Sequence, residues 1–269
     1  MIDNFKFNKK FGQNFISDKN LLSAIVSDAE ISSFDEVLEI GAGAGTLTTE
    51  ISEKAKKVVS YEIDKNLTEY LKEIEKNSNN IKIYIEDALK KPISEIEKDF
   101  AGQYHLIANL PYYITTPLVF KFLEESQKCK SLTIMVQKEV AERFCASVGQ
   151  EGYGIPSVVL DFFCERKITR IVSRKMFFPS PNVDSAVVVL KKKDLNFGPE
   201  FCQKFKKLVS LAFSMRRKTL FNNLKPVLQN KEEFEKILAK LGLNVNARAE
   251  ELKTEDFVFL TKMIYKIDN

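Results

Sequence analysis

The sequence predicts an α/β domain built on a parallel sheet, followed by a small C-terminal α-helical domain. Three observations lead to this prediction. Strand-like apolar segments alternate with helical patterns up to about residue 190. One glycine and three polar residues follow four of these strands at intervals of about one strand and one helix. Beyond about residue 200, apolar residues recur only at helical spacing. We therefore expect one domain at residues 1–193 and a second at residues 194–269.

The first strand expected in the sheet runs into a glycine-rich turn. Residues 37–40 are apolar except for one glutamate, and Gly41, Gly43 and Gly45 follow before a helical pattern begins at Thr46. This order is typical of nucleotide-like cofactors that lie across the carboxyl edge of a parallel sheet. A pyrophosphate-binding loop reads G-x-G-x-x-G, but here the third glycine comes one position early. If the loop is more than a tight turn, it favours a ligand without pyrophosphate, such as S-adenosylmethionine.

Three polar residues follow later strands at similar intervals. Glu62 lies 21 residues after Gly41, Asp87 lies 25 residues after Glu62, and Asn109 lies 22 residues after Asp87. The carboxyl ends of parallel strands meet at one edge, so we expect all four residues to line it. There Glu62 can accept hydrogen bonds from ribose hydroxyls, and Asp87 from an adenine amine. Taken alone, either carboxylate is better explained as a helix N-cap or a loop charge. The prediction of a shared cofactor site therefore depends on the common spacing of the four positions.

The segment Asn109-Leu110-Pro111-Tyr112 contains the groups that an exocyclic base amine needs. An adenine amine is a poor nucleophile because its lone pair is delocalised into the ring. An enzyme must accept hydrogen bonds from both N–H groups to favour a pyramidal nitrogen. The Asn109 side chain can accept one, and the Leu110 carbonyl can accept the other in the extended conformation that Pro111 imposes. Tyr112 can then stack on the purine. A β-turn after a buried strand is the alternative explanation.

The rest of the first domain is expected to close with an antiparallel pair of strands at residues 158–163 and 185–190. Residues 191–199 break the pattern and are expected to form the linker. Three apolar stripes then predict a small helical bundle. They are Phe201, Phe205, Leu208, Val209, Ala212 and Phe213; Phe234, Ile237, Leu238 and Leu241; and Phe257, Leu260 and Ile264.

Composition excludes several classes of protein. The 269 residues are 44% hydrophobic, which suffices for one large and one small domain. No run approaches the roughly 18 apolar residues of a membrane helix, and residues 1–6 are no signal peptide, so we expect a cytoplasmic protein without a membrane segment. The 4 cysteines show no C-x-x-C pair and no metal spacing, so we expect reduced thiols and no metal. The single histidine, His105, is expected to be structural.

Six motifs spread over nearly the whole chain resemble those of the ribosomal RNA adenine dimethyltransferase family. They are KFGQNF at residues 10–15, EIGAGAG at 39–45, NLPYYI at 109–114, FFPSPNVDSA at 177–186, RRKTL at 216–220 and RAEEL at 248–252. The resemblance implies a Rossmann-like, class I S-adenosylmethionine-dependent methyltransferase sheet with a small C-terminal α-helical domain. For the bacterial small-subunit branch it implies dimethylation of two adjacent adenosines near the 3′ end of 16S rRNA in the small ribosomal subunit, and a role in maturation of that subunit.

The resemblance also implies roles for single residues. It implies that S-adenosylmethionine contacts Asn14, Ile16, Gly41, Glu62, Asp87 and Asn109. It implies that the target adenine is held by Asn109, Leu110, Pro111 and Tyr112. Phe177 corresponds to the aromatic residue on the other face of that base. The family pattern is Phe-x-Pro-x-Pro, and Phe178 adjoins Phe177 here, so the register selects Phe177 without excluding its neighbour. Core packing is the alternative explanation for both rings.

Basic residues cluster in the predicted second domain. Residues 200–226 contain seven Lys or Arg and one acidic residue. Such a run is usually a solvated helix face, but in a domain attached to a base-modifying fold it favours contacts with phosphates. The candidate RNA-binding residues are Arg216, Arg217, Lys218, Lys204, Lys207 and Arg174. A second candidate patch near the Phe-Phe-Pro segment consists of Lys167, Arg170, Arg174 and Lys175.

The expected reaction is direct in-line methyl transfer to a base unstacked from a loop or single strand. Asn109 would orient the amine as an acceptor and would not act as a base. Residues 1–17 combine basic, aromatic and flexible residues, which predicts a lid segment over cofactor and RNA. We expect a monomer. Two other functions stay open: a large-subunit rRNA adenine methyltransferase of the antibiotic-resistance type, and a mainly non-catalytic ribosome-assembly factor.

Overall fold

The computed structural model describes residues 15–16 and 18–267. Contacts divide the chain into two compact units, the first of residues 1–141 and 166–192 and the second of residues 142–165 and 193–269. One division falls after residue 192, next to the expected domain boundary. The other differs from the expected domains, because residues 142–165 group with the C-terminal part of the chain.

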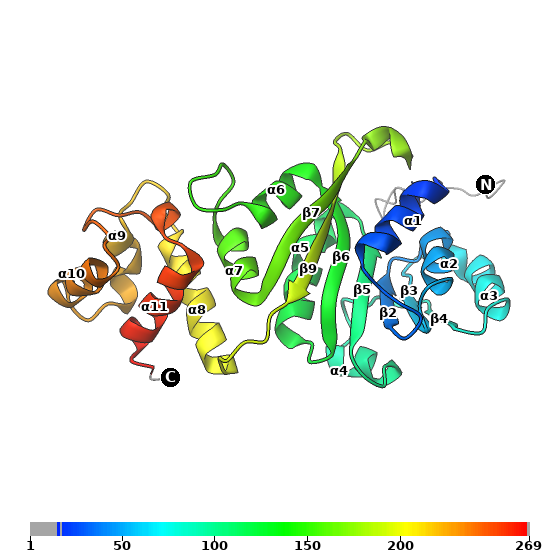
Figure 1. The fold of residues 1–269 in the computed structure, drawn as a ribbon, viewed down its shortest axis with the longest axis horizontal. Coiled ribbons are helices and arrows are strands. Elements are labelled where there is room, and N and C mark those ends of the chain that lie inside the picture. The colour runs from blue at the N-terminus through cyan, green and yellow to red at the C-terminus, as the bar shows by residue number, and fades with distance from the viewer. Residues whose placement is uncertain (1–14, 17, 268–269) are drawn as a thin grey trace. The chain divides into compact units, whose positions relative to one another are not determined.

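The first unit is built on a seven-stranded sheet with the order β4-β3-β2-β5-β6-β9-β7 (Figure 1). The strands are β2 (Glu36–Ile40), β3 (Lys57–Tyr61), β4 (Ile81–Tyr84), β5 (Tyr104–Asn109), β6 (Cys129–Gln137), β7 (Cys164–Val172) and β9 (Ser185–Lys192). Strands β2 to β6 are parallel, and β9 pairs antiparallel with β6. The chain passes from β2 to β3 and β4 on one side and returns to β5 on the other. The carboxyl ends of β2 and β5 therefore form a topological switch point, where α/β sheets bind ligands.

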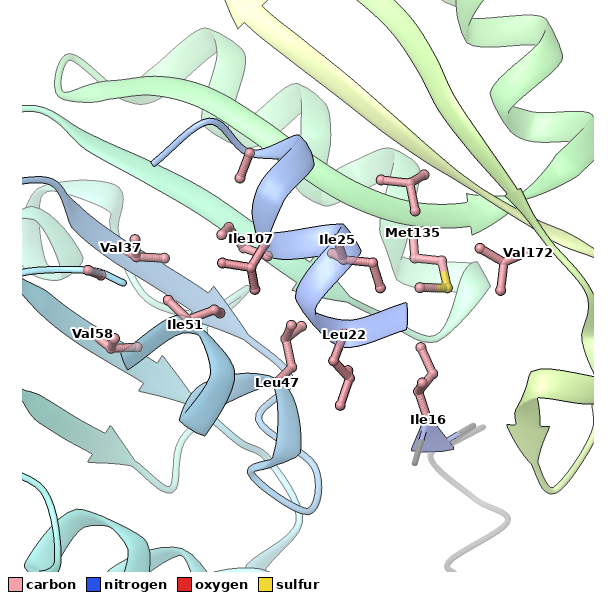
Figure 2. Packing of buried hydrophobic residues seen from close by; sticks show 14 of the residues in the cluster. Ile16, Leu22, Ile25, Val37, Leu47, Ile51, Val58, Ile107, Met135 and Val172 are labelled. Carbon is pink, nitrogen blue, oxygen red and sulfur yellow. The ribbon is translucent and has the colours of Figure 1, made fainter. Parts of the chain in front are cut away.

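Helices cover this sheet and enclose its core. Those of the first unit are α1 (Lys19–Asp28), α2 (Thr46–Ser52), α3 (Thr68–Lys76), α4 (Ile93–Ile96) and α5 (Tyr112–Glu125), while α6 (Lys138–Cys145) crosses the division between the units. Asp18 caps α1 by accepting a hydrogen bond from the N–H of Leu21 at 3.1 Å. Figure 2 shows Leu22 and Ile25 of α1 over the sheet residues Ile107 and Met135, in one buried apolar cluster that also includes residues of α2.

A second, two-stranded sheet joins the amino-terminal segment to the Phe-Phe-Pro motif. Strand β1 (Phe15–Ile16) pairs antiparallel with β8 (Phe177–Phe178), with Phe15 opposite Phe178 and Ile16 opposite Phe177. Phe15 and Ile16 belong to the expected lid segment. The other residues of that segment lie outside the described residues, so the lid stays a prediction.

The prediction of a strand at residues 158–163 is wrong. These residues belong to the helix α7 (Ile155–Phe163), and the strand beside β9 is the following segment, β7. Gly154 is the N-cap of α7, and a proline occupies the first turn, where its missing N–H costs nothing. Six of the nine residues of α7 are buried. A short, continuous apolar run does not distinguish a buried strand from a buried helix, which explains the error.

The second unit is helical, as expected. Besides α7 it contains α8 (Pro199–Ala212), α9 (Leu220–Leu224), α10 (Lys231–Lys240) and α11 (Thr254–Tyr265). Phe162 of α7 stacks on Phe205 of α8 with ring centroids 4.2 Å apart. The hydroxyl of Tyr153 donates to the carbonyl of Leu252 at 2.7 Å. These contacts explain why residues 142–165 belong to this unit.

Candidate functional site

The glycine loop after β2 needs glycine for backbone reasons. Gly41, Gly43 and Gly45 all have positive φ, at 84°, 56° and 69°, a region that L side chains rarely adopt. At Gly45, the N-cap of α2, a Cβ atom would also clash with the side chain of Ile74. The pattern G-x-G-x-G is therefore the sequence of a tightly wound turn at the carboxyl end of β2.

Glu62 holds this loop in place from the next strand. Its Oε2 accepts the N–H of Gly43 at 2.7 Å, and its Oε1 accepts the N–H groups of Ile63 at 2.9 Å and Asp64 at 2.8 Å. Burial raises the pKa of the Glu62 carboxyl, although these backbone hydrogen bonds act to lower it. A carboxylate has about four lone-pair sites, so Oε2 retains capacity for a further donor. The acid thus supports the loop and can still bind a hydroxyl.

The four positions expected at one sheet edge, Gly41 and three polar residues, do meet there. Ile40 of β2 pairs with Tyr61 of β3 and with Ala108 of β5, and Tyr61 pairs with Tyr84 of β4. The residues that follow these strand positions surround one cavity of about 240 Å³. A packing defect large enough for a single water needs only about 10–15 Å³. The cavity is therefore of ligand size and lies at the switch point of the sheet.

Most of the predicted cofactor and catalytic residues line this cavity. They are Ile16, Gly41, Glu62, Asp87, Asn109, Leu110, Pro111 and Phe177. Asn14 lies outside the described residues, and nothing is described of the Tyr112 side chain. The cavity also has apolar lining residues that the sequence argument missed, chiefly Ile63, Leu89 and Ile114. Ile63 is 44% exposed although it is a large apolar residue. Its place directly after Glu62 was the available signal.

Asp87 combines a local role with its place on the cavity. Its Oδ1 accepts the N–H of Leu89 at 3.0 Å, and the Lys90 ammonium lies 3.7 Å from its Oδ2. The loop-capping explanation therefore accounts for part of this side chain. A role in binding an adenine amine stays a prediction.

The Asn-Leu-Pro segment lies against the glycine loop. Pro111, with φ at −54° and ψ at 134°, is the N-cap of α5 and lies two residues after Asn109, the last residue of β5. A Cβ atom at Gly41 would lie 3.5 Å from the carbonyl oxygen of Asn109 and 3.4 Å from Cδ2 of Leu110. Glycine at position 41 therefore lets the two loops approach closely. The expected cofactor loop and the expected amine-binding segment share one wall of the cavity.

The two adjacent phenylalanines of β8 point to different surroundings. Phe177 is 5% exposed and lines the cavity, whereas Phe178 is 65% exposed. Alternation along a strand explains the difference. The structure thus agrees with Phe177 as the ring that faces the cavity. Its contact with a base stays a prediction, since Phe177 also packs in the apolar cluster that contains Ile16.

A second buried carboxyl group lies behind the glycine loop. Glu39 of β2 is fully buried, and its Oε2 accepts hydrogen bonds from Thr48 Oγ1 of α2 at 2.5 Å and from Ser60 Oγ of β3. Its Oε1 has no hydrogen-bond partner among the described residues. Burial raises the pKa of Glu39 to about 7, and the nearby Glu62 acts in the same direction. The protonated form of Glu39 is therefore favoured over most of the acidic pH range.

Several basic residues proposed for RNA are engaged within the protein. The Arg170 guanidinium donates to both carboxylate oxygens of Asp28, at 2.5 and 2.7 Å. Nη1 of Arg174 donates to the carbonyl of Asn182 at 3.0 Å. Lys204 pairs with Glu200 at 2.6 Å. The pairing of Arg170 with Asp28 on α1 could not be read from the sequence, whereas Glu200 and Lys204 form an i,i+4 pair on the surface of α8 and Arg174 stays exposed.

The remaining candidates are exposed. Arg216, Arg217 and Lys218 lie on the surface between α8 and α9, and Lys207 is exposed on α8. Their contact with RNA stays a prediction. No helix in the described part of the chain is long and apolar enough to cross a membrane.

His105 has the structural role that was expected. It is 6% exposed at the start of β5, at the sheet edge opposite the cavity. Its Nδ1 lies 2.7 Å from Ser131 Oγ, and its Nε2 lies 3.6 Å from Asp35 Oδ1. Burial lowers its pKa. The ring is thus a hydrogen-bonded part of the sheet.

Comparison with known proteins agrees with this geometry. The chain is 44% identical over 267 residues to the ribosomal RNA small subunit methyltransferase A of Clostridium botulinum (strain Kyoto / Type A2), covering 98% of this chain and 96% of that one. A crystal structure of a dimethyladenosine transferase from Plasmodium falciparum matches with a TM-score of 0.76 and 29% identity, covering 91% of this chain and 95% of the other. The 23S rRNA methyltransferase ErmE matches with a TM-score of 0.75 and 25% identity, covering 94% and 100%. The family model for ribosomal RNA adenine dimethylases matches residues 4–266, and the chain belongs to this family.

Proposed function

We propose that this chain transfers methyl groups from S-adenosylmethionine to the exocyclic amines of two adjacent adenosines near the 3′ end of 16S rRNA. The products are dimethyladenosines in the small ribosomal subunit, and the protein acts in the cytoplasm during maturation of that subunit. One observation carries the proposal. Asn109, Leu110 and Pro111 share a cavity at the sheet switch point with Glu62, so an amine-binding segment adjoins a cofactor-type acid.

The cavity residues fit S-adenosylmethionine. Glu62 retains acceptor capacity for ribose hydroxyls, and Asp87 offers a carboxylate on the same edge. Ile63, Leu89 and Ile114 provide apolar surface for an adenine ring. The positive charge of the sulfonium makes the methyl group electrophilic, so the protein needs no metal to activate it. Residues that follow the strands thus offer contacts for the ribose and the adenine of this donor.

The residues at the end of β5 would align the acceptor amine. Asn109 would accept one N–H through its side-chain oxygen, and the Leu110 carbonyl would accept the other. Alignment of the reacting nitrogen within about 3–3.5 Å of the methyl group is the largest contribution available to the protein. Asn109 carries no charge, so it orients the amine and does not remove its proton. The proton leaves after transfer, when the nitrogen has become cationic and acidic. Phe177 would pack against the base from the other side.

The second unit would bind the rRNA backbone. Arg216, Arg217 and Lys218 are exposed in one turn, and phosphate contacts of this kind give affinity without sequence preference. We propose that the protein binds the subunit as a monomer. Because RNA must present an unstacked adenosine, a loop or single strand is the favoured target.

Two other functions are weighed against this proposal. Similarity of fold does not separate the two kinds of enzyme, since the TM-scores of 0.76 to a dimethyladenosine transferase and 0.75 to the 23S rRNA methyltransferase ErmE are nearly equal. Sequence identity favours the small-subunit enzyme, at 44% against 25%. The predicted site residues that line the cavity argue against an assembly factor without catalysis and are compatible with a protein that has both roles.

One experiment distinguishes the three functions. The protein is incubated with S-adenosylmethionine and either unmodified small subunits or unmodified large subunits, and methylated adenosines are mapped by mass spectrometry. We expect two adjacent dimethyladenosines in 16S rRNA and no modification of large subunits. A single modified adenosine in large subunits would support the second function. Tight binding to small subunits without methylation would support the third.

A further inference from the structure

Leu89 is held by hydrogen bonds on both sides of its backbone, while its side chain lines the cavity. Its N–H donates to Oδ1 of Asp87 at 3.0 Å, and its carbonyl accepts a hydrogen bond from the Lys121 ammonium at 2.6 Å. The same ammonium donates to the carbonyl of Lys91 at 2.6 Å. Two of the three donors of an ammonium are thus bound to the β4–α4 loop, residues 85–92, at the edge of the sheet that bears the cavity.

Contacts within the β4–α4 loop are local. The N–H of Lys91 donates to the carbonyl of Ala88 at 3.4 Å, and the Lys91 ammonium pairs with Glu86 at 2.7 Å. These contacts shape the turn itself. The bonds from Lys121 attach the turn to α5, which lies 30 and 32 positions further along the chain from the two carbonyls. Lys121 therefore ties a loop of the cavity to a separate helix.

The helix α5 carries Lys121 on the same face as a residue of the cavity. Ile114 lines the cavity, and it lies seven residues before Lys121, which is close to two full helical turns. Pro111, the N-cap of α5, also lines the cavity. The helix thus begins at the segment expected to hold the acceptor amine and binds the β4–α4 loop further along. Through Lys121 it joins that segment to the loop that contains Asp87.

The bonds from Lys121 are of a strong type. An ammonium that donates to carbonyls makes charge-assisted hydrogen bonds, which are stronger than those between neutral groups. The Lys121 side chain is only partly exposed, so water competes less for its donors. A methionine in its place would leave both carbonyls without this donor. The peptide unit after Leu89 would then be free to rotate, which would loosen the turn that orients the Asp87 carboxylate.

We propose that Lys121 is a positioning residue for the adenine of S-adenosylmethionine. It acts through Leu89, whose carbonyl it fixes and whose N–H binds the carboxylate of Asp87. This inference rests on the proposed function, because it assigns the adenine amine to Asp87. Among the described residues, those that line the cavity do not include Lys121. Its effect on the cofactor is therefore indirect.

Two purine ligands test the proposal. S-adenosylhomocysteine carries the amine, whereas S-inosylhomocysteine carries an oxygen at the same position and would present an acceptor to Asp87. In calorimetric titration we expect the wild type to bind the first ligand at least about tenfold more tightly, the effect of one charged hydrogen bond. In Lys121→Met this ratio should fall at least about threefold, because the carboxylate is no longer held in place. An unchanged ratio in Lys121→Met, or a wild type that does not discriminate, would overturn the proposal.

Lys128→Met is the matched control. The Lys128 ammonium also donates to two backbone carbonyls, those of Glu97 at 3.1 Å and Phe100 at 2.7 Å, and its side chain is likewise partly exposed. It precedes β6 at the sheet edge opposite the cavity. We expect both variants to lose a similar free energy of unfolding and only Lys121→Met to lose discrimination. An equal loss of discrimination in Lys128→Met would overturn the proposal, since general destabilisation would then explain it.

Steady-state kinetics with small subunits give a second measurement. A contact of Asp87 with adenine is the same before and during methyl transfer, so its loss should raise KM for S-adenosylmethionine and leave kcat near that of the wild type. A lower kcat at unchanged KM would contradict a role in cofactor positioning. Lys121→Gln keeps a neutral donor and should show the same changes to a smaller extent, also where Lys121→Met does not fold.

The two kinds of measurement separate this inference from the proposed function. A wild type that discriminates between the two purine ligands but does not methylate small subunits would refute the proposed function and leave the ligand-binding test of Lys121 decisive. A wild type that methylates small subunits, together with a Lys121→Met variant of unchanged discrimination, would refute the role of Lys121 alone.

Discussion

Glu39 is expected to make the stability of the fold depend on pH near neutrality. Burial raises its pKa from 4.5 to about 7, so the folded state binds the proton more tightly than the unfolded state. The resulting stability is fully present below the unfolded pKa and is lost as the pH rises through the folded pKa. A pKa difference of this size corresponds to roughly 3 kcal/mol in total. Between pH 5 and pH 8, linkage predicts a loss of about 2.5 kcal/mol from this group.

Glu39→Gln removes this dependence, because glutamine resembles the protonated acid in shape and charge. The assay is chemical unfolding followed by circular dichroism at several pH values from 5 to 8, for wild type and variant without ligand. Other titrating groups act on both proteins, so the difference in their free energies of unfolding isolates Glu39. We expect this difference to shift by about 2–3 kcal/mol in favour of the variant as the pH rises from 5 to 8.

Ser60→Ala provides a directional control. The Ser60 hydroxyl donates to Oε2 of Glu39 and lowers its pKa. Its removal should raise that pKa further and move the pH-dependent loss of stability to higher pH. A difference between wild type and Glu39→Gln that stays constant from pH 5 to pH 8 would refute the reasoning. Glu39 would then have the same protonation in the folded and unfolded states.

Three further predictions concern the proposed function. Asn109→Ala should lower the single-turnover rate of methylation at least about tenfold with little effect on unfolding, because loss of the hydrogen bond also misaligns the reacting amine. An unchanged rate would show that Asn109 has no part in the mechanism. Glu62→Ala should weaken S-adenosylmethionine binding in calorimetric titration, and an affinity within about twofold of wild type would contradict the ribose role. It should also lower the free energy of unfolding by about 1–3 kcal/mol, because three backbone N–H groups lose their acceptor. Replacing Arg216, Arg217 and Lys218 together by Ala should lower the salt slope of RNA binding by up to about 0.7–0.9 per lost contact, with cofactor affinity unchanged; an unchanged slope would place the RNA surface elsewhere.

The sheet edge was predictable because the spacing of strands determines where their ends meet. Gly41, Glu62, Asp87 and Asn109 are separated by 21, 25 and 22 residues, each about one strand and one helix. In a parallel sheet such units return every strand end to one edge, and all four residues line one cavity. The position of these strand ends follows from local spacing and does not depend on long-range packing. This is why the cavity was easier to predict than the strand wrongly expected at residues 158–163.

Two features of the site, the orientation of Phe177 toward the cavity and the burial of Glu39, depend on contacts with other elements that a linear sequence pattern does not contain. The alternation of Phe177 and Phe178 follows from strand geometry, but the side on which the cavity lies follows from the pairing with β1. Glu39 occurs within the glycine motif, yet its burial depends on Thr48 and Ser60 from α2 and β3. Partners in other elements thus decide whether a motif residue faces a ligand or the core.

Pairing within the protein reduces the number of basic side chains that are available to bind RNA phosphates. Arg170 is 142 positions from Asp28 in the chain, and the two form a two-pronged ion pair. Burial acts to raise the pKa of Asp28, but hydrogen bonds from Arg170 and Thr169 and the charge of Arg170 together outweigh it, so the pKa is lowered. Arg174 donates to a neutral carbonyl of its own loop and keeps its charge exposed. A count of charges near the Phe-Phe-Pro segment therefore overstates the available phosphate contacts by Arg170, because only groups free to exchange counterions contribute to the salt slope. For the described residues, we therefore expect the exposed cations of the second unit to contribute more of that slope than Arg174 and Lys175 beside the Phe-Phe-Pro segment.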